Sequence, residues 1–335
     1  MKYLLFQYAY PPPGFVNLGD YIQTIAVREA LKQIGCNEKD FVFFDRDALS
    51  YYSGEECVCV MNGWFSHTLT WFPSSRITPV YFGSHLNHKI LDYIAANGEV
   101  KDRLSCGVVG ARDVYTKDFL LSQGIDSFYS GCLTLTLPKR KSKPPKYKPF
   151  IVDVPDNCYH LIPNSVKKNS VRVSQKSVGH YSGGHLHQAL YYKKADDLLK
   201  TYQNEASIVI TSALHCACPC LAMGIPVVFL WPNTHKLNEC QRISLVGDFL
   251  PIYSMKNLRS ACVDWAPQEL DLEDIKFQML HRLQAMININ INEQGRNVGK
   301  QFINDRSDIV RHTNQVIFSE KIYKRILNKI ISIKK

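Results

Sequence analysis

The sequence predicts an α/β protein of two domains, on three observations. At 335 residues the chain is longer than most single domains. Segment Ser207–Trp231 has the pattern of a buried strand, a short helix and a second buried strand, the repeating unit of a parallel sheet. The same alternation occurs before and after the Pro- and Lys-rich segment Pro138–Pro149. We therefore expect one domain over 1–140, a linker over 141–149 and a second domain over 150–300.

The composition indicates a cytoplasmic protein, and we expect no cofactor. The eleven cysteines, an odd number scattered along the chain, are typical of reduced thiols. Cys216, Cys218 and Cys220 would not converge on one ion from a short helix, so we interpret them as small core residues and expect no metal. The first ten residues lack a signal-peptide cleavage site and are predicted to form a strand.

The net charge of +10 is compatible with nucleic acid, an anionic membrane or small anionic substrates. No nucleic-acid-binding motif is present, so nucleic acid is not expected as a partner. Much of the charge lies in Lys139–Lys148 and in Lys321–Lys335, as is typical of a solvated linker and a solvated helix face. We expect residues 301–335 to form helices that pack back across a domain, with peripheral contact to the inner membrane face as the alternative.

The N-terminal half alternates strands and helices in a regular order. The predicted elements are strands at Lys2–Tyr8, Phe41–Phe44, Cys57–Met61, Val80–Gly83 and Ser105–Val109, and helices at Tyr21–Ile34 and Val114–Gln123.

The C-terminal half repeats this alternation. The predicted elements are strands at Phe150–Val154, Val171–Val173, Ile208–Ile210 and Pro226–Leu230, and helices at Ala189–Gln203, between the last two strands, and at Leu272–Met286. Pro219 is expected in the first turn of the helix between Ile210 and Pro226, where a missing N–H costs little.

Polar residues follow several of these strands at the sheet edge where open α/β sheets bind ligands. His215 follows one strand, and its alternative role is that of a satisfied core or cap residue. Arg112 follows another and could clamp a carboxylate or phosphate, or form a structural ion pair with Asp113 or another acid. Asn17 and Asp20 are suited equally to capping the first helix and to seating an anionic ligand.

Three motifs resemble the polysaccharide pyruvyl transferase family. They are Asn17-Leu-Gly-Asp20 with the helix after it, Gly110-Ala-Arg-Asp113, and the longer segment Val209–Pro226, in which a strand, Thr-Ser, Leu-His and Gly-x-Pro follow in the family's order. The resemblance covers about Asn17 to Asp248. It implies two Rossmann-like domains facing each other across a cleft, as in GT-B glycosyltransferases.

The family resemblance also implies an activity and its partners. The enolpyruvyl carbons of phosphoenolpyruvate are transferred to two hydroxyls of a sugar or lipid-linked glycan, forming a pyruvate ketal and releasing phosphate. By resemblance His215 is the acid/base, Arg112 anchors phosphoenolpyruvate, and Asp20 orients or deprotonates the sugar hydroxyl. The N-terminal domain would hold the acceptor and the C-terminal domain the donor. The remaining substrate-binding candidates are Asn17, Gly19, Ser212, Leu214, His180 and Arg242.

The chain departs from the family at Ala213, where members often carry an arginine two residues before the motif histidine. Arg242, Lys236 or His235 could replace this cation, or the donor could differ. A GT-B-type glycosyltransferase that uses a nucleotide sugar, and a non-catalytic glycan-binding protein, are the alternative interpretations.

Overall fold

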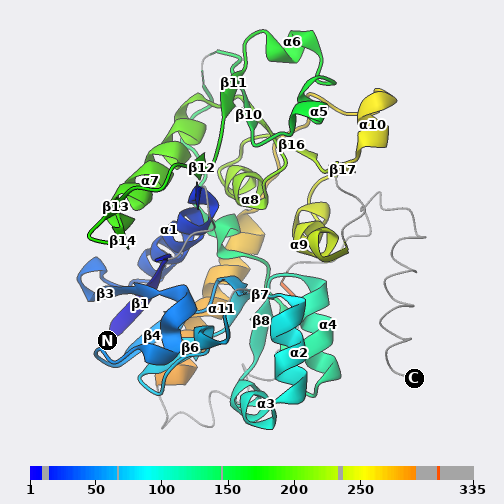
Figure 1. The fold of residues 1–335 in the computed structure, drawn as a ribbon. Coiled ribbons are helices and arrows are strands. Elements are labelled where there is room, and N and C mark those ends of the chain that lie inside the picture. Colours follow the sequence, from blue (N-terminus) through cyan, green and yellow to red (C-terminus); the bar gives the residue numbers. More distant parts are fainter. Residues whose placement is uncertain (10–14, 66–67, 145, 233–236, 292–307, 310–335) are drawn as a thin grey trace.

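The computed structural model describes residues 1–9, 15–65, 68–144, 146–232, 237–291 and 308–309. It is a mixed α/β structure in which parallel sheets form the framework and helices pack against them (Figure 1). The α/β prediction is therefore confirmed. The helices predicted within 301–335, and with them the membrane alternative, fall outside the described residues except for positions 308 and 309.

The N-terminal half forms two four-stranded parallel sheets, β3-β1-β4-β6 and β5-β7-β8-β9. They continue into one another because β4 leads into β5 and β6 into β7, and the Met61 N–H donates to the Val80 carbonyl at the junction, at 2.8 Å. The strand order turns back between β1 and β4, as in doubly wound folds. The strands are β1 (Lys2–Gln7), β3 (Phe41–Asp45), β4 (Cys57–Val60), β5 (Gly63–Phe65), β6 (Ile77–Val80), β7 (Phe82–Leu86), β8 (Val109–Ala111) and β9 (Ser127–Tyr129).

The C-terminal half forms a five-stranded parallel sheet in the order β11-β10-β15-β16-β17. Its central strands are buried along their whole length, as expected for parallel strands covered by helices on both faces. The order turns back between β10 and β15, so ligands at this sheet would bind near the ends of these two strands. The strands are β10 (Pro149–Val152), β11 (Val171–Val173), β15 (Ile208–Thr211), β16 (Val227–Leu230) and β17 (Ile252–Tyr253).

The helices fill the faces of these sheets, and short strands and 3₁₀ turns connect them. The helices are α1 (Leu18–Gln33), α2 (His88–Ala96), α3 (Gly98–Ser105), α4 (Val114–Ser122), α5 (Asp156–Tyr159), α6 (Asn164–Lys167), α7 (Gln188–Glu205), α8 (Leu214–Ala222), α9 (Leu237–Gly247), α10 (Met255–Arg259) and α11 (Glu273–Ile291). The short strands are β2 (Val16–Asn17), β12 (Lys176–Ser177), β13 (Tyr181–Ser182) and β14 (His185–Leu186). The 3₁₀ turns are η1 (Glu38–Asp40), η2 (Arg46–Tyr51), η3 (Leu69–Trp71) and η4 (Leu133–Thr136).

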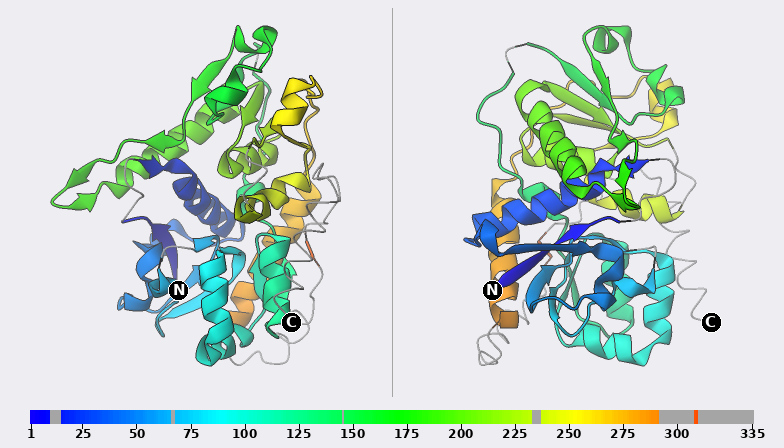
Figure 2. Two further views of the ribbon diagram at one scale, coloured as in Figure 1. Left: turned by 45° about the vertical axis from the view of Figure 1, so that its right-hand side comes forward. Right: turned by 60° about the vertical axis from the view of Figure 1, so that its left-hand side comes forward.

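Direct contacts join the two halves. Strand β2 pairs antiparallel with β12, and the Leu18 N–H donates to the Gln175 carbonyl at 2.8 Å. Helices α1 and α7 lie side by side in both views of Figure 2, and α11 runs back along the N-terminal sheets. One hydrophobic core extends through the contact, including Tyr21 of α1, Tyr191 of α7 and Leu283 of α11.

The strand predicted over Ser105–Val109 is wrong. Ser105 ends α3, and β8 begins only at Val109. Asn97 caps α3 by accepting a hydrogen bond from the Val100 N–H at 3.2 Å, and Val100 and Leu104 form its buried face with helical spacing. The helix accounts for Ser105, and residues 106–108 form the turn between α3 and β8, so the strand begins four residues later than predicted.

Two further predictions need correction. The strand predicted over Val80–Gly83 is divided at Tyr81 into β6 and β7. Within β7, Gly83 has a φ of +77° and the register with β8 shifts there. A Cβ at Gly83 would lie 2.1 Å from Asn62 Oδ1, so this position requires glycine. Pro219 lies inside α8 rather than in its first turn, because the helix already begins at Leu214.

The cysteines of α8 are core residues, as predicted. Cys216, Cys218 and Cys220 are fully buried in the hydrophobic core. Within the described ranges, no group of three or more His, Cys, Asp or Glu side chains is arranged to hold a metal ion. None of the helices in the same ranges is long and apolar enough to cross a membrane.

We expect a buried hydrogen bond between the halves to contribute to stability. The Tyr129 hydroxyl in β9 donates to Asp248 Oδ2, just after α9, at 2.5 Å. Tyr129→Phe removes this donor from a buried carboxylate and should lower the free energy of unfolding by about 1–3 kcal/mol in urea titration. Tyr51→Phe, at a side chain that is 71% exposed, is the control and should change it by less than about 0.5 kcal/mol. Equal effects of the two substitutions would contradict this role.

Candidate active site

Segments that follow parallel strands of both halves meet at the N-termini of α1 and α8. Arg112 directly follows β8, and His215 is the second residue of α8, which follows β15. A Cβ added at Gly19, in the first turn of α1, would lie 3.1 Å from His215 Cβ. His215 therefore lies close to the space that a side chain at Gly19 would occupy, and the two helix N-termini are in contact.

Arg112 is buried, with 1% of its surface exposed. Its Nη1 donates to Gln23 Oε1 at 3.1 Å and lies 3.4 Å from His215 Nε2. The Nε and Nη2 atoms are also buried, and no acceptor in the described part of the chain hydrogen-bonds to them. Burying guanidinium donors without acceptors is costly, so this edge of Arg112 is suited to an anion supplied from outside.

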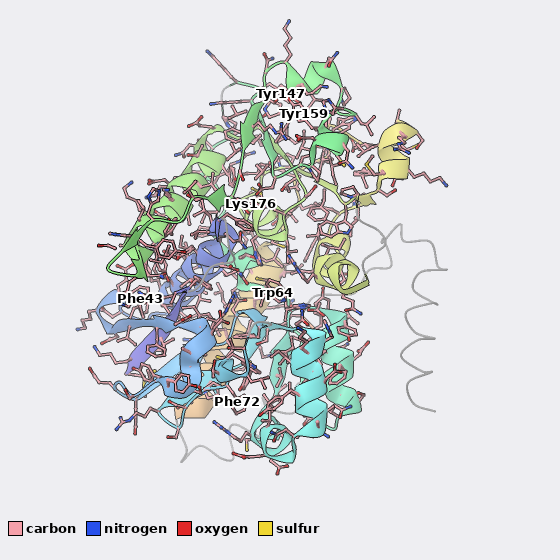
Figure 3. The ribbon with its side chains drawn as sticks, viewed as in Figure 1. Phe43, Trp64, Phe72, Tyr147, Tyr159 and Lys176 are labelled. Carbon is pink, nitrogen blue, oxygen red and sulfur yellow. The ribbon has the colours of Figure 1, made fainter. Side chains whose placement is uncertain are left out.

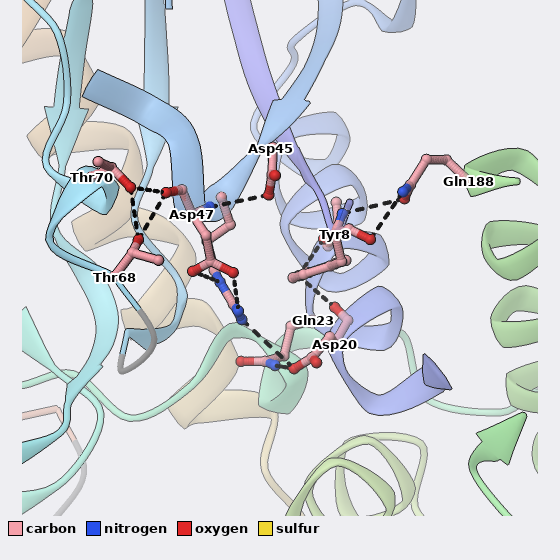
Figure 4. Close-up of polar contacts among 10 residues, drawn as sticks. Tyr8, Asp20, Gln23, Asp45, Asp47, Thr68, Thr70 and Gln188 are labelled. Carbon is pink, nitrogen blue, oxygen red and sulfur yellow. Dashed lines mark hydrogen bonds and ion pairs between the residues drawn. The ribbon is translucent and has the colours of Figure 1, made fainter. Parts of the chain in front are cut away.

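Gln23 connects Arg112 to Asp20. Its Nε2 donates to Asp20 Oδ1 at 3.2 Å, while its Oε1 accepts from Arg112. Arg46, in turn, lies 3.9 Å from Asp20 Oδ1 and 2.8 Å from Asp47 Oδ2, so the Asp20 carboxylate is held from two sides (Figure 4). Asp20, Arg112 and His215, which the resemblance singled out, thus belong to one hydrogen-bonded network.

His215 is a neutral imidazole in this environment. Burial lowers its pKa well below the ordinary value of histidine, and the charges of Arg112, Arg242 and His85 lower it further. Because Arg112 has only donors, His215 Nε2 must accept and the proton must lie on Nδ1. The unprotonated nitrogen therefore faces the buried guanidinium.

A buried glutamine compensates for the proline in α8. Pro219 has no N–H to donate to the carbonyl of His215 four residues earlier. Gln175 replaces that donor, since its Nε2 donates to the His215 carbonyl at 3.2 Å. The backbone carbonyl of Gln175 also accepts a hydrogen bond from the Leu18 N–H at the start of α1. One residue that is 2% exposed therefore holds the N-termini of both helices of the site.

The structure adds a histidine–aspartate pair to the site. His85 Nδ1 lies 2.5 Å from Asp113 Oδ2, and Asp113 also caps α4 by accepting from the Thr116 N–H at 2.9 Å. Burial lowers the pKa of His85, although Asp113 opposes this. Burial raises the pKa of Asp113, but His85 and the Thr116 N–H outweigh it and keep the pKa below the ordinary value. Asp113 thus pairs with His85, and Arg112 forms no ion pair within the described residues.

Arg242 of α9 contributes charge to the same site. Its guanidinium lies 4.9 Å from the ring centroid of Trp64, which Figure 3 labels near the middle of the molecule. Its charge lowers the pKa of both His85 and His215. Arg242 is therefore within electrostatic range of both histidines.

Ala213, where the family often has arginine, is the N-cap of α8, and its N–H donates to Thr211 Oγ1 at 3.0 Å. His235 and Lys236, the other cations considered as replacements, lie outside the described residues.

The other residues predicted to bind substrate lie in different surroundings. Asn17 caps α1 by accepting from the Gly19 N–H at 3.0 Å. Ser212 Oγ is buried beside α8 with no hydrogen-bond partner among the described residues. Leu214 begins α8 and is buried in the core. His180 is exposed and stacks on Tyr191 of α7, with none of its described contacts reaching the Arg112 network.

Three site residues were not found from the sequence. The only sequence feature that could have indicated Gln23 is its position one helical turn after Asp20. His85 lies near the end of β7 and could have been matched with Arg112 only through the register of two strands. Gln175 acts through contacts with both halves, so nothing in its local sequence marks it.

Comparison with known proteins identifies the class. The family model of polysaccharide pyruvyl transferases matches residues 17–234, which include Asp20, Gln23, Arg112 and His215. The chain belongs to the polysaccharide pyruvyl transferase family. An uncharacterized protein of Klebsiella pneumoniae is similar over 71% of this chain and 87% of its own, at 16% identity and a TM-score of 0.40. No curated protein matches the chain significantly.

We expect Gln175→Met to impair the site with little loss of stability. The substitution keeps the side-chain length but removes the amide that donates to the His215 carbonyl. The first turn of α8 would then lose about 1 kcal/mol and hold His215 less firmly against Arg112. Turnover should fall by roughly tenfold or more while thermal unfolding shifts by only a few degrees. Gln203→Met, on α7, is the control, and unchanged turnover in Gln175→Met would contradict the role assigned to the amide.

Proposed function

We propose that the protein transfers a pyruvyl group from phosphoenolpyruvate to a sugar of a polysaccharide or its precursor, forming a pyruvate ketal and releasing phosphate. The observation that carries this proposal is the buried edge of Arg112 beside His215, whose donors lack acceptors in the described chain. Family membership supplies the reaction class, and this edge fits the donor's chemistry.

The donor carries two anionic groups, and the site offers matching donors. A carboxylate or phosphate can accept two parallel hydrogen bonds from Arg112 Nε and Nη2. Ser212 Oγ and the N-terminus of α8 supply further donors for the same charge. Arg242, whose charge already reaches His215, is our candidate for the cation absent at Ala213.

In the proposed reaction C3 of phosphoenolpyruvate gains a proton, and two sugar hydroxyls each lose one. In the first step C3 is protonated and a sugar oxygen adds to C2. The bond from C2 to the bridging oxygen then breaks, phosphate leaves, and the second hydroxyl adds to C2. One hydroxyl proton balances the proton gained by C3, and the other leaves with phosphate. His215 is our candidate for protonating C3, and Asp20 for orienting the sugar.

We propose that the two halves act as Rossmann-like domains facing across a cleft, with the acceptor on the N-terminal side and the donor on the C-terminal side. The turn-back points of both strand orders support this arrangement, because α1 and α8 begin there. The proposed bounds are 1–140 and 150–300, and helix α11 of the second domain packs back against the N-terminal half.

Ala213 favours one alternative donor, a nucleotide sugar in a GT-B-type glycosyltransferase. Product analysis separates the two functions. The protein is incubated with phosphoenolpyruvate and a panel of p-nitrophenyl hexosides, while released phosphate and the masses of the glycosides are measured. Phosphate release with a mass gain of pyruvate minus water supports the proposal. Transfer of a hexose from a nucleotide sugar, with no consumption of phosphoenolpyruvate, supports the alternative. If neither reaction is observed, the remaining interpretation is a glycan-binding protein without catalytic activity.

Arg112→Ala should weaken binding of phosphoenolpyruvate. Losing a buried charge-assisted pair costs about 2 kcal/mol or more, which is roughly a 30-fold increase in Kd by calorimetry. Arg172→Ala, at an exposed ion pair with Asp156, is the control and should bind like the wild type. Equal affinity of Arg112→Ala and the wild type would show that the donor does not use this guanidinium.

Binding of phosphoenolpyruvate should take up a proton. Free His215 is neutral at pH 7 because burial and the two arginines depress its pKa. An anion that faces these arginines offsets their charge and raises the pKa of His215, so affinity should fall as pH rises through the raised value. Calorimetry in two buffers of different ionisation enthalpy measures the uptake. His215→Gln should abolish it, and equal heats in both buffers for the wild type would contradict this coupling.

A further inference from the structure

The His85–Asp113 pair is not used by the roles given so far. His85 is 4% exposed and Asp113 is fully buried. Asp113 accepts from His85 Nδ1, and Nε2 makes no hydrogen bond to the described residues. The carboxylate thus fixes the tautomer that leaves the Nε2 lone pair available, which is the arrangement of a general base with its orienting acid.

Backbone pairing brings His85 next to Arg112. Strands β7 and β8 are parallel with Ser84 opposite Ala111, and the Arg112 N–H donates to the Ser84 carbonyl at 2.9 Å. His85 and Arg112 are therefore neighbours at the ends of two adjacent strands. The charge of His85 also contributes to lowering the pKa of His215, so both histidines lie within electrostatic range of each other.

The proposed reaction needs a proton donor and a proton acceptor in the same step. While C3 of phosphoenolpyruvate gains a proton, the sugar hydroxyl that adds to C2 must lose one. A single imidazole at His215 cannot do both at once. Asp20 has its Oδ1 occupied by Gln23 and lies 3.9 Å from Arg46, so it is held in place by cationic and amide donors.

We propose that His85 is the second acid–base group of the site and that Asp113 is its positioning residue. This assignment rests on the proposed function. His85 Nε2 takes the proton of the acceptor hydroxyl as the bond between the sugar oxygen and C2 forms. The imidazolium that results is stabilised by the Asp113 carboxylate. It returns its proton to phosphate or solvent after the C2–O bond to the leaving phosphate has broken.

A purely structural role does not account for the pair. Asp113 already caps α4 through the Thr116 N–H and also accepts from Thr116 Oγ1 at 3.2 Å. The cap is complete without a histidine. His85 also stabilises the buried Asp113 carboxylate, but this contact uses only Nδ1 and leaves Nε2 without a hydrogen bond to the described residues.

Charged groups on neighbouring elements set the working range of this base. Burial disfavours the protonated form of His85, as do the charges of Arg112 and Arg242, while the negative charge of Asp113 favours it. An anionic donor offsets the arginines and shifts the balance toward protonation. Activity should therefore rise with pH as His85 loses its proton in the complex.

Asp113→Asn is the sharpest test. Asparagine caps helices as well as aspartate, so α4 should form. Its amide, however, donates to His85 Nδ1, which moves the imidazole proton to Nε2 and removes the base. We expect kcat to fall roughly 100- to 10,000-fold, with the KM for phosphoenolpyruvate changed by a few-fold at most. The residual rate should increase with pH beyond the wild-type plateau, because hydroxide replaces the missing base.

Asp271→Asn makes the same chemical change at an exposed residue beside α11 and should keep full activity. A wild-type-like kcat in Asp113→Asn, with turnover in the wild type, would refute the role of His85 while leaving the proposed function intact. No consumption of phosphoenolpyruvate by the wild type with any probe glycoside would refute both.

His85→Ala distinguishes catalysis from packing. With a base missing, added imidazole should restore part of kcat, and a series of azoles should restore it in the order of their basicity. Rescue that follows azole size instead of basicity, or no rescue in a variant that still binds phosphoenolpyruvate by calorimetry, would show that His85 only fills space.

Discussion

The contact between Arg112 and His215 is the constraint on which the rest of the site depends. Two groups that can both be cationic meet in a buried position, with Arg112 Nη1 at 3.4 Å from His215 Nε2. Such a contact is stable only while the imidazole is neutral, and it is incomplete because the other edge of Arg112 has no described acceptor. In the proposed function, an anionic substrate would complete the hydrogen bonds of Arg112, and its charge would raise the pKa of His215 so that the imidazole takes up a proton. On this proposal, substrate binding would itself prepare His215 to act as an acid.

The fold produces this contact by joining two sheets whose strand orders both turn back beside the site. Helices α1 and α8 begin at these points and meet there, since Gly19 has no side chain to separate them. Gln175 then holds both N-termini, and it is needed because Pro219 leaves the His215 carbonyl without its helical donor. The proline and the glutamine have to be understood together, although they are distant in sequence.

The sequence predicted the α/β class, the strands β1, β3 and β15, and the helices α1, α4 and α7, because hydrophobic periodicity and caps are local. It also indicated Asp20, Arg112 and His215, each of which directly follows or closely follows a strand. It could not predict Gln23, His85 or Gln175, because their roles depend on strand register and on contacts between the halves. The strand expected over Ser105–Val109 failed because α3 runs to Ser105 and a turn over 106–108 separates it from β8.

The central claim is that this buried arginine–histidine pair serves the transfer of a pyruvyl group as a ketal. The most direct measurement is carbon NMR of the reaction of phosphoenolpyruvate labelled with ¹³C at C2, in the presence of a probe glycoside. The account predicts that the enol carbon signal is replaced by that of a quaternary ketal carbon bonded to two sugar oxygens, and that Arg112→Ala forms it far more slowly. Persistence of the enol signal while a nucleotide sugar is consumed would contradict the account.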